Sequence, residues 1–452
     1  MSFPGTLDPT TGQTRLPSMT LPLRFVVTGL ASLGVGIGVL VWRPDLLATY
    51  HYNQYILAVT HLFVLGFLSS IVMGAMYQLV PVALETRLHS ERLARWHYVA
   101  HTVGFIGMVA TFWTWNMKEV GHYGSVFALG VGLFVFNMAK TLRTIPRWNV
   151  IAAAIGSALF WLSMTVLAGL YLATSKCWDF SPFAAIPAMH AHAHLGGLGV
   201  FVMLIVGVSY KLIPMFALGE LQSPRRAAWS VGLLNAGLLG LFVTILIQSR
   251  LKLGFALVVI AGLALYGLEM RAILRHRTRR ALDWGVRSFL TAIALLVPLS
   301  VLALVLCWPG LPATGFTTQL ENVYGFLGLL GVVAFAILGM LYKIVPFLVW
   351  FHRYSGEIGR GRVPAMAEMY SERLQVAGYW TFLAGLAASS VGIALGHETG
   401  VRWSCSLLAL SLGIFALNMG KVLRHLVRFK APQPVPARPL HASSTRNRMA
   451  LT

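Results

Sequence analysis

Charged side chains are scarce in this sequence of 452 residues, making up 11% of the chain against 57% hydrophobic residues. A soluble protein of this length needs more polar surface, so a soluble fold is excluded. Cysteine is scarce as well. Cys177, Cys307 and Cys405 are the three in the chain, too few for a disulfide-built scaffold, although a Cys307–Cys405 bond stays open.

Long apolar runs fill most of the chain instead. Each is about 18 to 25 residues long, which is enough for a helix to cross about 30 Å of hydrocarbon. The sequence therefore predicts an all-α integral membrane protein with twelve transmembrane helices. The predicted spans are 22–42, 56–82, 97–117, 122–142, 150–174, 188–216, 228–248, 252–274, 286–307, 322–350, 376–396 and 402–425. A polar segment, 1–20, and a Pro-rich basic tail, 430–452, flank the membrane domain 21–429.

A weak repeat of four helices runs through the membrane domain. The second helix of each unit ends in a similar motif, namely MYQLVPVAL at 76–84, SYKLIPMFAL at 209–218 and LYKIVPFLV at 341–349. We expect three units, approximately 21–147, 148–280 and 281–429, related by pseudo-threefold symmetry about the membrane normal.

Basic residues are distributed unevenly along the chain, and their positions explain the net charge of +21. The odd-numbered connections hold six of the 35 Lys and Arg, which are Arg43, Lys118, Lys176, Arg250, Lys252 and Arg402. The positive-inside rule then predicts a bacterial inner-membrane protein with both termini in the cytoplasm. Topology and contact with anionic membrane lipid account for the charge, so no nucleic-acid partner is expected.

Histidines stand at the start of the second and sixth spans. His61 lies twenty residues before Pro81, and His194 lies twenty residues before Pro214, with His190 and His192 just ahead of it. Helices of the same direction would bring His61 and His194 to the same depth. Two neutral imidazoles at one depth on neighbouring helices are what an axially ligated haem iron requires.

Helix geometry separates the roles of these histidines. His192 and His194 point about 200° apart on a helix, so they cannot bind one iron. We expect His61 and His194 to be the axial ligands of a b-type haem, because the chain has no Cys-x-x-Cys-His motif. His192 would face the opposite groove, with a second haem or a metal, while His190 and His122 would support the ligands or the haem edge. The alternative is that these histidines bond only to backbone or water.

The third unit departs from the other two at this level. Its positions matching His190, His192 and His194 hold Asn322, Tyr324 and Phe326. It therefore supplies no histidine ligand.

The stretch HAHLGGLGVFVMLIVGVSYKLIP, 192–214, resembles the His-x-His helix of haem-copper oxidase subunit I, in the branch of nitric oxide reductases and C-type cytochrome c oxidases. In that helix the first histidine binds the high-spin haem and the second binds the low-spin haem. HLFVLGFLSSIVMGAMYQLVP, 61–81, resembles the helix that supplies the other low-spin ligand. The resemblance implies the family's twelve-helix plan and haem binding.

Two departures limit what the resemblance implies. The His-x-His pair lies in the sixth predicted span, whereas the family has it in the tenth. The seventh span, 228–248, has no histidine, so the family's ligands for copper or non-haem iron are missing. A standard oxygen- or NO-reducing centre cannot be assembled from these residues, and copper is not expected.

The function predicted from the sequence is that of a membrane b-type cytochrome. It would pass electrons between a quinol or periplasmic carrier and a partner subunit, which makes an electron-transfer oxidoreductase more consistent with the residues than a standard oxygen reductase. Two alternatives stay open. One is a divergent terminal oxidase or NO reductase with His192 on a high-spin haem, and the other is a copper- or metal-handling transporter.

Overall fold

A computed structural model of the chain describes residues 20–358 and 363–427. The regular secondary structure of these residues is entirely helical. The α-helices are α1 (Thr20–Trp42), α2 (Asp45–Ala48), α3 (Gln54–His61), α4 (Ser70–Ala83), α5 (Glu91–Trp113), α6 (Met117–Leu142), α7 (Val150–Trp178), α8 (Ala185–His194), α9 (Met203–Ala217), α10 (Pro224–Leu246), α11 (Lys252–Arg275), α12 (Trp284–Ala294), α13 (Leu296–Cys307), α14 (Gly315–Phe326), α15 (Phe335–Tyr354), α16 (Glu372–Ala394) and α17 (Glu398–Val427). Three π-helical segments are η1 (Leu62–Ser69), η2 (Leu195–Val202) and η3 (Leu327–Ala334), and two short 3₁₀ turns are η4 (Ser355–Glu357) and η5 (Met366–Met369).

The helices form one bundle of membrane-spanning length. Within the described residues, eleven continuous helical stretches are long and apolar enough to cross a membrane. Helix α5 occupies the third predicted span, 97–117, the one that is not among these eleven, and packs against α3 and α6. It is less apolar because its first two turns carry Glu91, Arg92 and Arg95. The prediction of an all-α, multi-pass membrane protein is confirmed.

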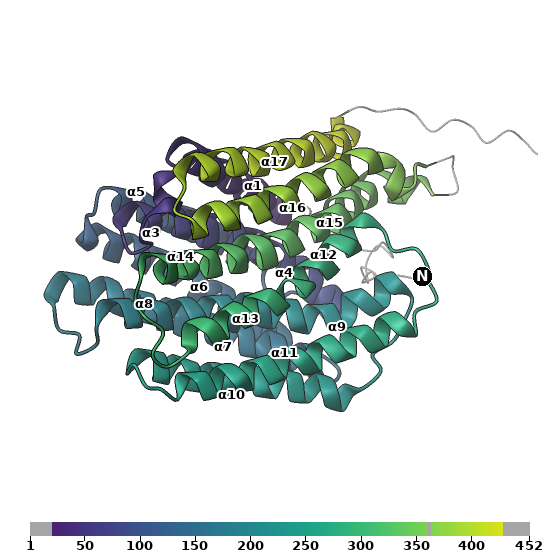
Figure 1. The fold of residues 1–452 in the computed structure, drawn as a ribbon. Helices are drawn as coiled ribbons and strands as arrows, with labels where there is room; N and C mark the ends of the chain where they lie inside the picture. The colour runs from purple at the N-terminus through teal and green to yellow at the C-terminus, as the bar shows by residue number, and fades with distance from the viewer. Residues whose placement is uncertain (1–19, 359–362, 428–452) are drawn as a thin grey trace, which may run out of the picture.

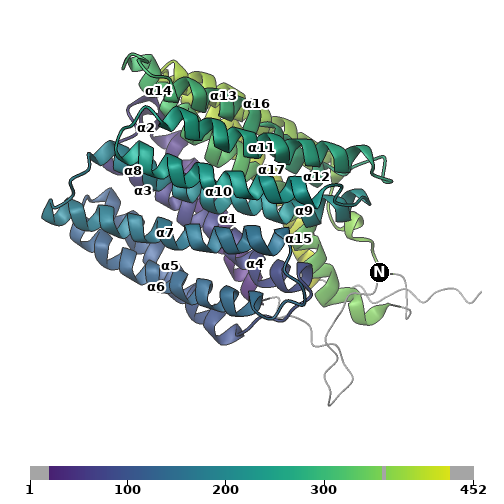
Figure 2. The same cartoon turned by 90° about the horizontal axis from the view of Figure 1, so that it is seen from below.

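Figures 1 and 2 show the helices running roughly along one axis, so the bundle has two ends. Helices α3, α8 and α14 lie toward one end, here called the histidine end. Helices α9, α12 and α15 lie toward the other, here called the arginine end. Eight tryptophans 58% to 71% exposed lie near the two ends, namely Trp42, Trp178, Trp308 and Trp403 at the histidine end, and Trp96, Trp148, Trp229 and Trp380 at the arginine end. Two such belts are typical of a protein that spans a bilayer.

Three long helices form the interior of the bundle. They are the continuous stretches α3–η1–α4, α8–η2–α9 and α14–η3–α15, and their most apolar windows are 67%, 72% and 78% buried, compared with 22% to 44% in the other eight spans. Each contains a π segment at the matched position, beginning directly after His61, His194 or Phe326. Segment η3 packs against both η1 and η2. The three inner helices therefore meet where their helical hydrogen bonding is widened.

In each unit, a polar side chain near the end of the fourth helix forms a hydrogen bond with the backbone at the start of the third helix. In every case its oxygen accepts the backbone N–H of a serine, which satisfies a donor that the new helix cannot pair. The three pairs are Asn137 with Ser90 (3.0 Å), Glu269 with Ser223 (3.0 Å) and Asn418 with Ser371 (2.8 Å). The same contact thus recurs at matched positions of the repeat.

The three cysteines are free. Cys405 is buried on α17, with its sulfur 3.9 Å from the Ser389 hydroxyl of α16. The Cys307–Cys405 disulfide that the sequence left open is therefore not formed.

Close packing of α5 against α6 gives a test of the fold. A Cβ atom added at Gly104 would lie 2.6 Å from the backbone of Phe127, whereas one added at Gly132 meets nothing within 4 Å. Gly104→Ala should lower the free energy of unfolding by about 1–3 kcal/mol through overpacking. Gly132→Ala should leave it unchanged or raise it by up to about 1 kcal/mol, because alanine favours a helix. Thermal unfolding in detergent measures both, and equal midpoints for the two variants would contradict this packing.

A histidine cluster between the inner helices

Local sequence explains why the histidines sit on regular helix. The Asn53 side chain accepts the N–H groups of Tyr55 and Ile56 and so starts α3, which ends at His61. In α8 the histidines alternate with alanine, the residue that most favours a helix. Both helices continue without a break into a π segment.

His61 is held by two contacts. Its Nδ1 lies 2.7 Å from the backbone carbonyl of Leu57, and since a carbonyl only accepts, Nδ1 carries the proton. The ring stacks on Phe112 of α5, with centroids 4.5 Å apart and planes at 28°. The Nε2 lone pair is therefore the one available to a metal.

His194 has the same backbone contact but faces another neighbour. Its Nδ1 donates to the carbonyl of His190, at 2.8 Å. Its Nε2 lies 3.4 Å from the hydroxyl of Tyr324 on α14, and the two rings are stacked with centroids 5.9 Å apart. His194 thus faces the third inner helix.

His192 lies on the side of its helix toward α7. A Cβ atom added at Gly169 of α7 would come within 3.0 Å of the His192 ring. Nδ1 of His192 is buried without a hydrogen-bond partner, which is costly for a polar atom inside a bilayer.

The repeat predicts a partner for His61. His194 contacts Tyr324, which stands two residues before the position matching His194 in the next unit. The same relation between the first and second units would set His61 opposite His192. Because His194 is turned toward Tyr324, this relation offers a His61–His192 pair beside the predicted His61–His194 pair.

His190 belongs to a second group at the histidine end. Its Nε2 lies 3.1 Å from Nε2 of His51, in the connection between α2 and α3. Nδ1 of His51 lies 2.9 Å from Oδ1 of Asn322, and Nε2 of His51 lies 3.8 Å from the Glu321 carboxylate. Burial lowers the pKa of His51 below its ordinary value, with the Asn322 hydrogen bond opposing in part, so the ring is neutral at pH 7.

Sequence reasoning assigned no role to His51 or Glu321. A usable signal existed for one of them, because Glu321 precedes the position that matches His190 in the third unit. For His51 the sequence offered none, since nothing local says that this connection reaches α8 and α14.

Three other histidines lie outside this cluster. His122 was expected to support the haem site, but its side chain is 62% exposed and pairs with Glu119 one turn away on α6. We therefore do not place it at the site. His97 and His101 are buried on α5, bonded to Tyr77 (2.8 Å) and Ser70 (2.9 Å) of α4.

A small apolar cavity lies in the interface that carries His61 and His192, deeper in the bundle. Its volume is about 10 Å³. Its walls come from α4, α6 and α7 and from the η2–α9 stretch, with Met73, Phe134, Leu162 and Phe201 among them. Below the histidines this interface is therefore lined by apolar side chains.

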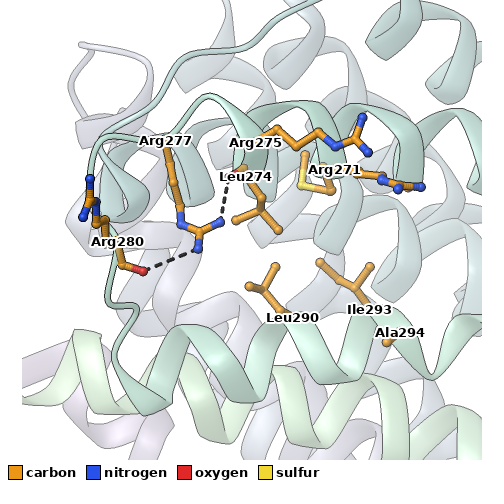
Figure 3. A pocket seen from close by; sticks show the side chains of 10 residues that line it. Arg271, Leu274, Arg275, Arg277, Arg280, Leu290, Ile293 and Ala294 are labelled. Carbon is orange, nitrogen blue, oxygen red and sulfur yellow. Dashed lines mark hydrogen bonds between the residues drawn. The ribbon is translucent and has the colours of Figure 1, made fainter.

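A second cavity lies far from this histidine cluster. Figure 3 shows it at the arginine end, between α11 and α12, where Arg271, Arg275, Arg277 and Arg280 surround an apolar floor. Its volume is about 630 Å³. Basic side chains over apolar ones suit the anionic lipid contact expected from the charge distribution.

Comparison with known proteins gives distant relatives. No family model matches the chain. The cbb3-type cytochrome c oxidase subunit CcoN1 of Stutzerimonas stutzeri is 25% identical over 149 residues, covering 32% of this chain and 31% of that protein. A cytochrome c oxidase subunit 1 homolog, bacteroid, of Bradyrhizobium diazoefficiens is 24% identical over 149 residues, or 32% of this chain and 27% of that one. The matched segment thus spans less than a third of either oxidase subunit.

A longer match and a solved structure complete the comparison. An uncharacterized protein of Aquifex aeolicus is 25% identical over 295 residues, covering 64% of this chain and 70% of that protein. The cryo-EM structure of a haem-copper terminal oxidase dimer superposes with a TM-score of 0.60 at 12% identity, over 92% of this chain and 84% of that chain. This similarity shows the fold, which is that of a haem-copper oxidase subunit I, as the sequence predicted.

Asn322 provides a test of the histidine end. Its side-chain oxygen accepts the Nδ1–H of His51. Its side-chain nitrogen donates to the backbone carbonyl of Thr49 (2.7 Å) and to the side-chain Oε1 of Gln319 (2.7 Å). Asn322→Leu should lower the free energy of unfolding by about 1–3 kcal/mol, because buried polar groups lose their partners. Thermal unfolding is the measurement, with Thr318→Val on the same helix as the control, since that hydroxyl only bonds back to Gly315. Unchanged stability of the Asn322 variant would contradict the network.

Proposed function

We propose that this protein, a membrane chain with the fold of haem-copper oxidase subunit I, is a b-type cytochrome that holds one haem between His61 and His192. It transfers electrons between a quinol or periplasmic carrier and a partner subunit. The match to the cbb3-type subunit supports a relation to the C-type branch. The proposal is supported by the repeat relation, which would set His61 opposite His192, by the Nδ1–H of His61 that bonds to a backbone carbonyl, and by a buried, unpartnered nitrogen on His192.

The residues present fit a haem iron. His61 donates Nδ1–H to a backbone carbonyl, which is the contact that orients and strengthens an imidazole ligand. Gly169 leaves space beside His192, where any larger residue would meet the ring. Phe112 stacks on His61, and apolar residues line the interface below, as a hydrophobic macrocycle requires.

When bound, the haem supplies one-electron redox chemistry, and this chain's residues set its environment. His61 and His192 would fix the iron from both faces, and the apolar wall would keep water away. The uneven distribution of basic residues supports a periplasmic histidine end with cytoplasmic termini. A haem at that end would lie within reach of a periplasmic or membrane-dissolved electron carrier.

Electron transfer is favoured over oxygen or NO reduction by one feature of the seventh predicted span. Helix α10 carries no histidine, so it cannot supply the extra metal ligands that the resemblance to reductases implies. His61 and His192 would both be ligands of the proposed haem. A six-coordinate haem has no free position for a gas molecule.

The axial pair can be tested by spectroscopy of the purified protein. The wild type should show reduced-minus-oxidised b-type bands and about one haem per chain by pyridine haemochrome. His61→Ala and His192→Ala should each lose most of the haem or its low-spin spectrum. His194→Ala should keep both, as should the control His276→Ala, whose ring is exposed near the arginine end.

Each outcome decides between assignments. Loss of the low-spin spectrum in His194→Ala but not in His192→Ala would overturn the His61–His192 pair in favour of His61–His194. Wild-type protein without haem would overturn the cytochrome proposal. Carbon monoxide binding to the reduced wild type would favour a reductase, whereas binding only to the His192→Ala protein would support the six-coordinate assignment.

A further inference from the structure

Three potential metal ligands converge at the histidine end, outside the proposed haem pair. They are His51 before α3, His190 on α8 and Glu321 on α14, and their ligand atoms all lie within 4.8 Å of one another. Each comes from a different unit of the repeat, next to one of the three inner helices. The group is therefore a product of the tertiary structure.

The hydrogen bonds of Asn322 define the tautomer of His51. The Asn322 nitrogen donates to Thr49 and Gln319, so its oxygen faces Nδ1 of His51 as an acceptor. Nδ1 of His51 therefore carries the proton, and Nε2 presents its lone pair to His190 and Glu321. A metal-binding histidine is typically oriented by such an acceptor on its other nitrogen.

The distances match the edges of a coordination shell. Zinc binds imidazole nitrogen and carboxylate oxygen at about 2.0–2.2 Å, so two ligand atoms on a tetrahedron are about 3.3 Å apart. Nε2 of His51 lies 3.1 Å from Nε2 of His190 and 3.8 Å from Oε2 of Glu321. The third edge, between His190 and Glu321, is at most 4.8 Å, so an ion placed between the three atoms would draw the Glu321 side chain toward His190.

The site is partly open to solvent. The side chains of His51 and Glu321 are 17% and 35% exposed, which allows an ion to enter and leaves a fourth position for water. Lys252 is the neighbouring cation, and its charge acts on both His190 and Glu321. A single positive charge opposes a cation but does not block the three lone pairs.

We propose that His51, His190 and Glu321 bind one divalent transition-metal ion of the zinc or copper class. Two imidazoles and one carboxylate suit these ions better than calcium or magnesium, which prefer oxygen ligands alone. The ion would tie the α2–α3 connection to α8 and α14. His190 also accepts the Nδ1–H of His194 through its carbonyl, so the ion would hold the turn of α8 that carries His192.

Metal titration of the chelator-treated protein tests this site and does not depend on the haem. The protein is purified without a histidine tag and titrated with Zn²⁺ or Cu²⁺, and bound metal is counted after equilibrium dialysis. One equivalent should bind, and His51→Ala, His190→Ala and Glu321→Gln should each weaken binding at least tenfold. His122→Ala, which alters the surface pair with Glu119, is the matched control and should bind as the wild type does.

Two further measurements make the result specific. The Cu²⁺ form should show nitrogen hyperfine splitting from two imidazoles by electron paramagnetic resonance, and one in His51→Ala. Lys252→Gln should bind more tightly, because a repelling charge is removed. Glu321→Gln should keep the b-type spectrum, so that a lost metal site is distinguished from a lost haem site or a failure to fold.

The proposal is overturned if the wild type binds no more metal ions per chain than the Glu321→Gln variant does. Wild-type affinity in all three ligand variants would overturn it as well. A weaker site in Lys252→Gln would also contradict the placement of the ion beside that lysine.

Discussion

An imidazole inside a membrane must find partners for both ring nitrogens, since no water is there to solvate them. His61 and His194 use the same solution, giving Nδ1–H to a backbone carbonyl one turn earlier. This leaves each ring with one lone pair pointing away from its own helix. The role of each histidine then depends on the partner of this second nitrogen, and the neighbouring helix supplies that partner.

The pseudo-threefold bundle offers the same interface three times, with different residues in each. Between the second and third units, His194 meets Tyr324, which satisfies the nitrogen without a cofactor. Between the first and second units, two histidines take these positions, and the proposed haem lies there. A single scaffold thus carries a cofactor site in one interface and ordinary packing in another, according to which side chains occupy matched positions.

The π segments explain why these positions come together. Each begins directly after His61, His194 or Phe326, and η3 packs against η1 and η2. A wider helical turn changes the direction in which the preceding side chains point relative to the helix below. Hydrophobic patterning did not reveal these segments, because they are as apolar as the helix around them. The predicted opposition of His192 and His194 on their helix agrees with their different neighbours, Gly169 of α7 and Tyr324 of α14.

Prediction from sequence succeeded where a property is local. The number of apolar runs gave the spans, and the similar motifs at 76–84, 209–218 and 341–349 marked the matched ends of the three inner helices. It failed for His122, which sits at the right end of the bundle but on its exposed surface. The position of a residue along the bundle axis could be predicted from the sequence, whereas the direction in which its side chain points around that axis could not.

By itself the sequence determined that the chain is a helical membrane protein and that histidines stand at the starts of its second and sixth spans. These follow from hydropathy and from a rise of about 1.5 Å per residue, which depend only on residues close in the chain. Only the tertiary structure decided that His194 faces Tyr324 and that His51 lies beside His190 and Glu321. Such neighbours depend on how helices more than a hundred residues apart rotate and pack, and each rotation is fixed by the side chains of all its partners together.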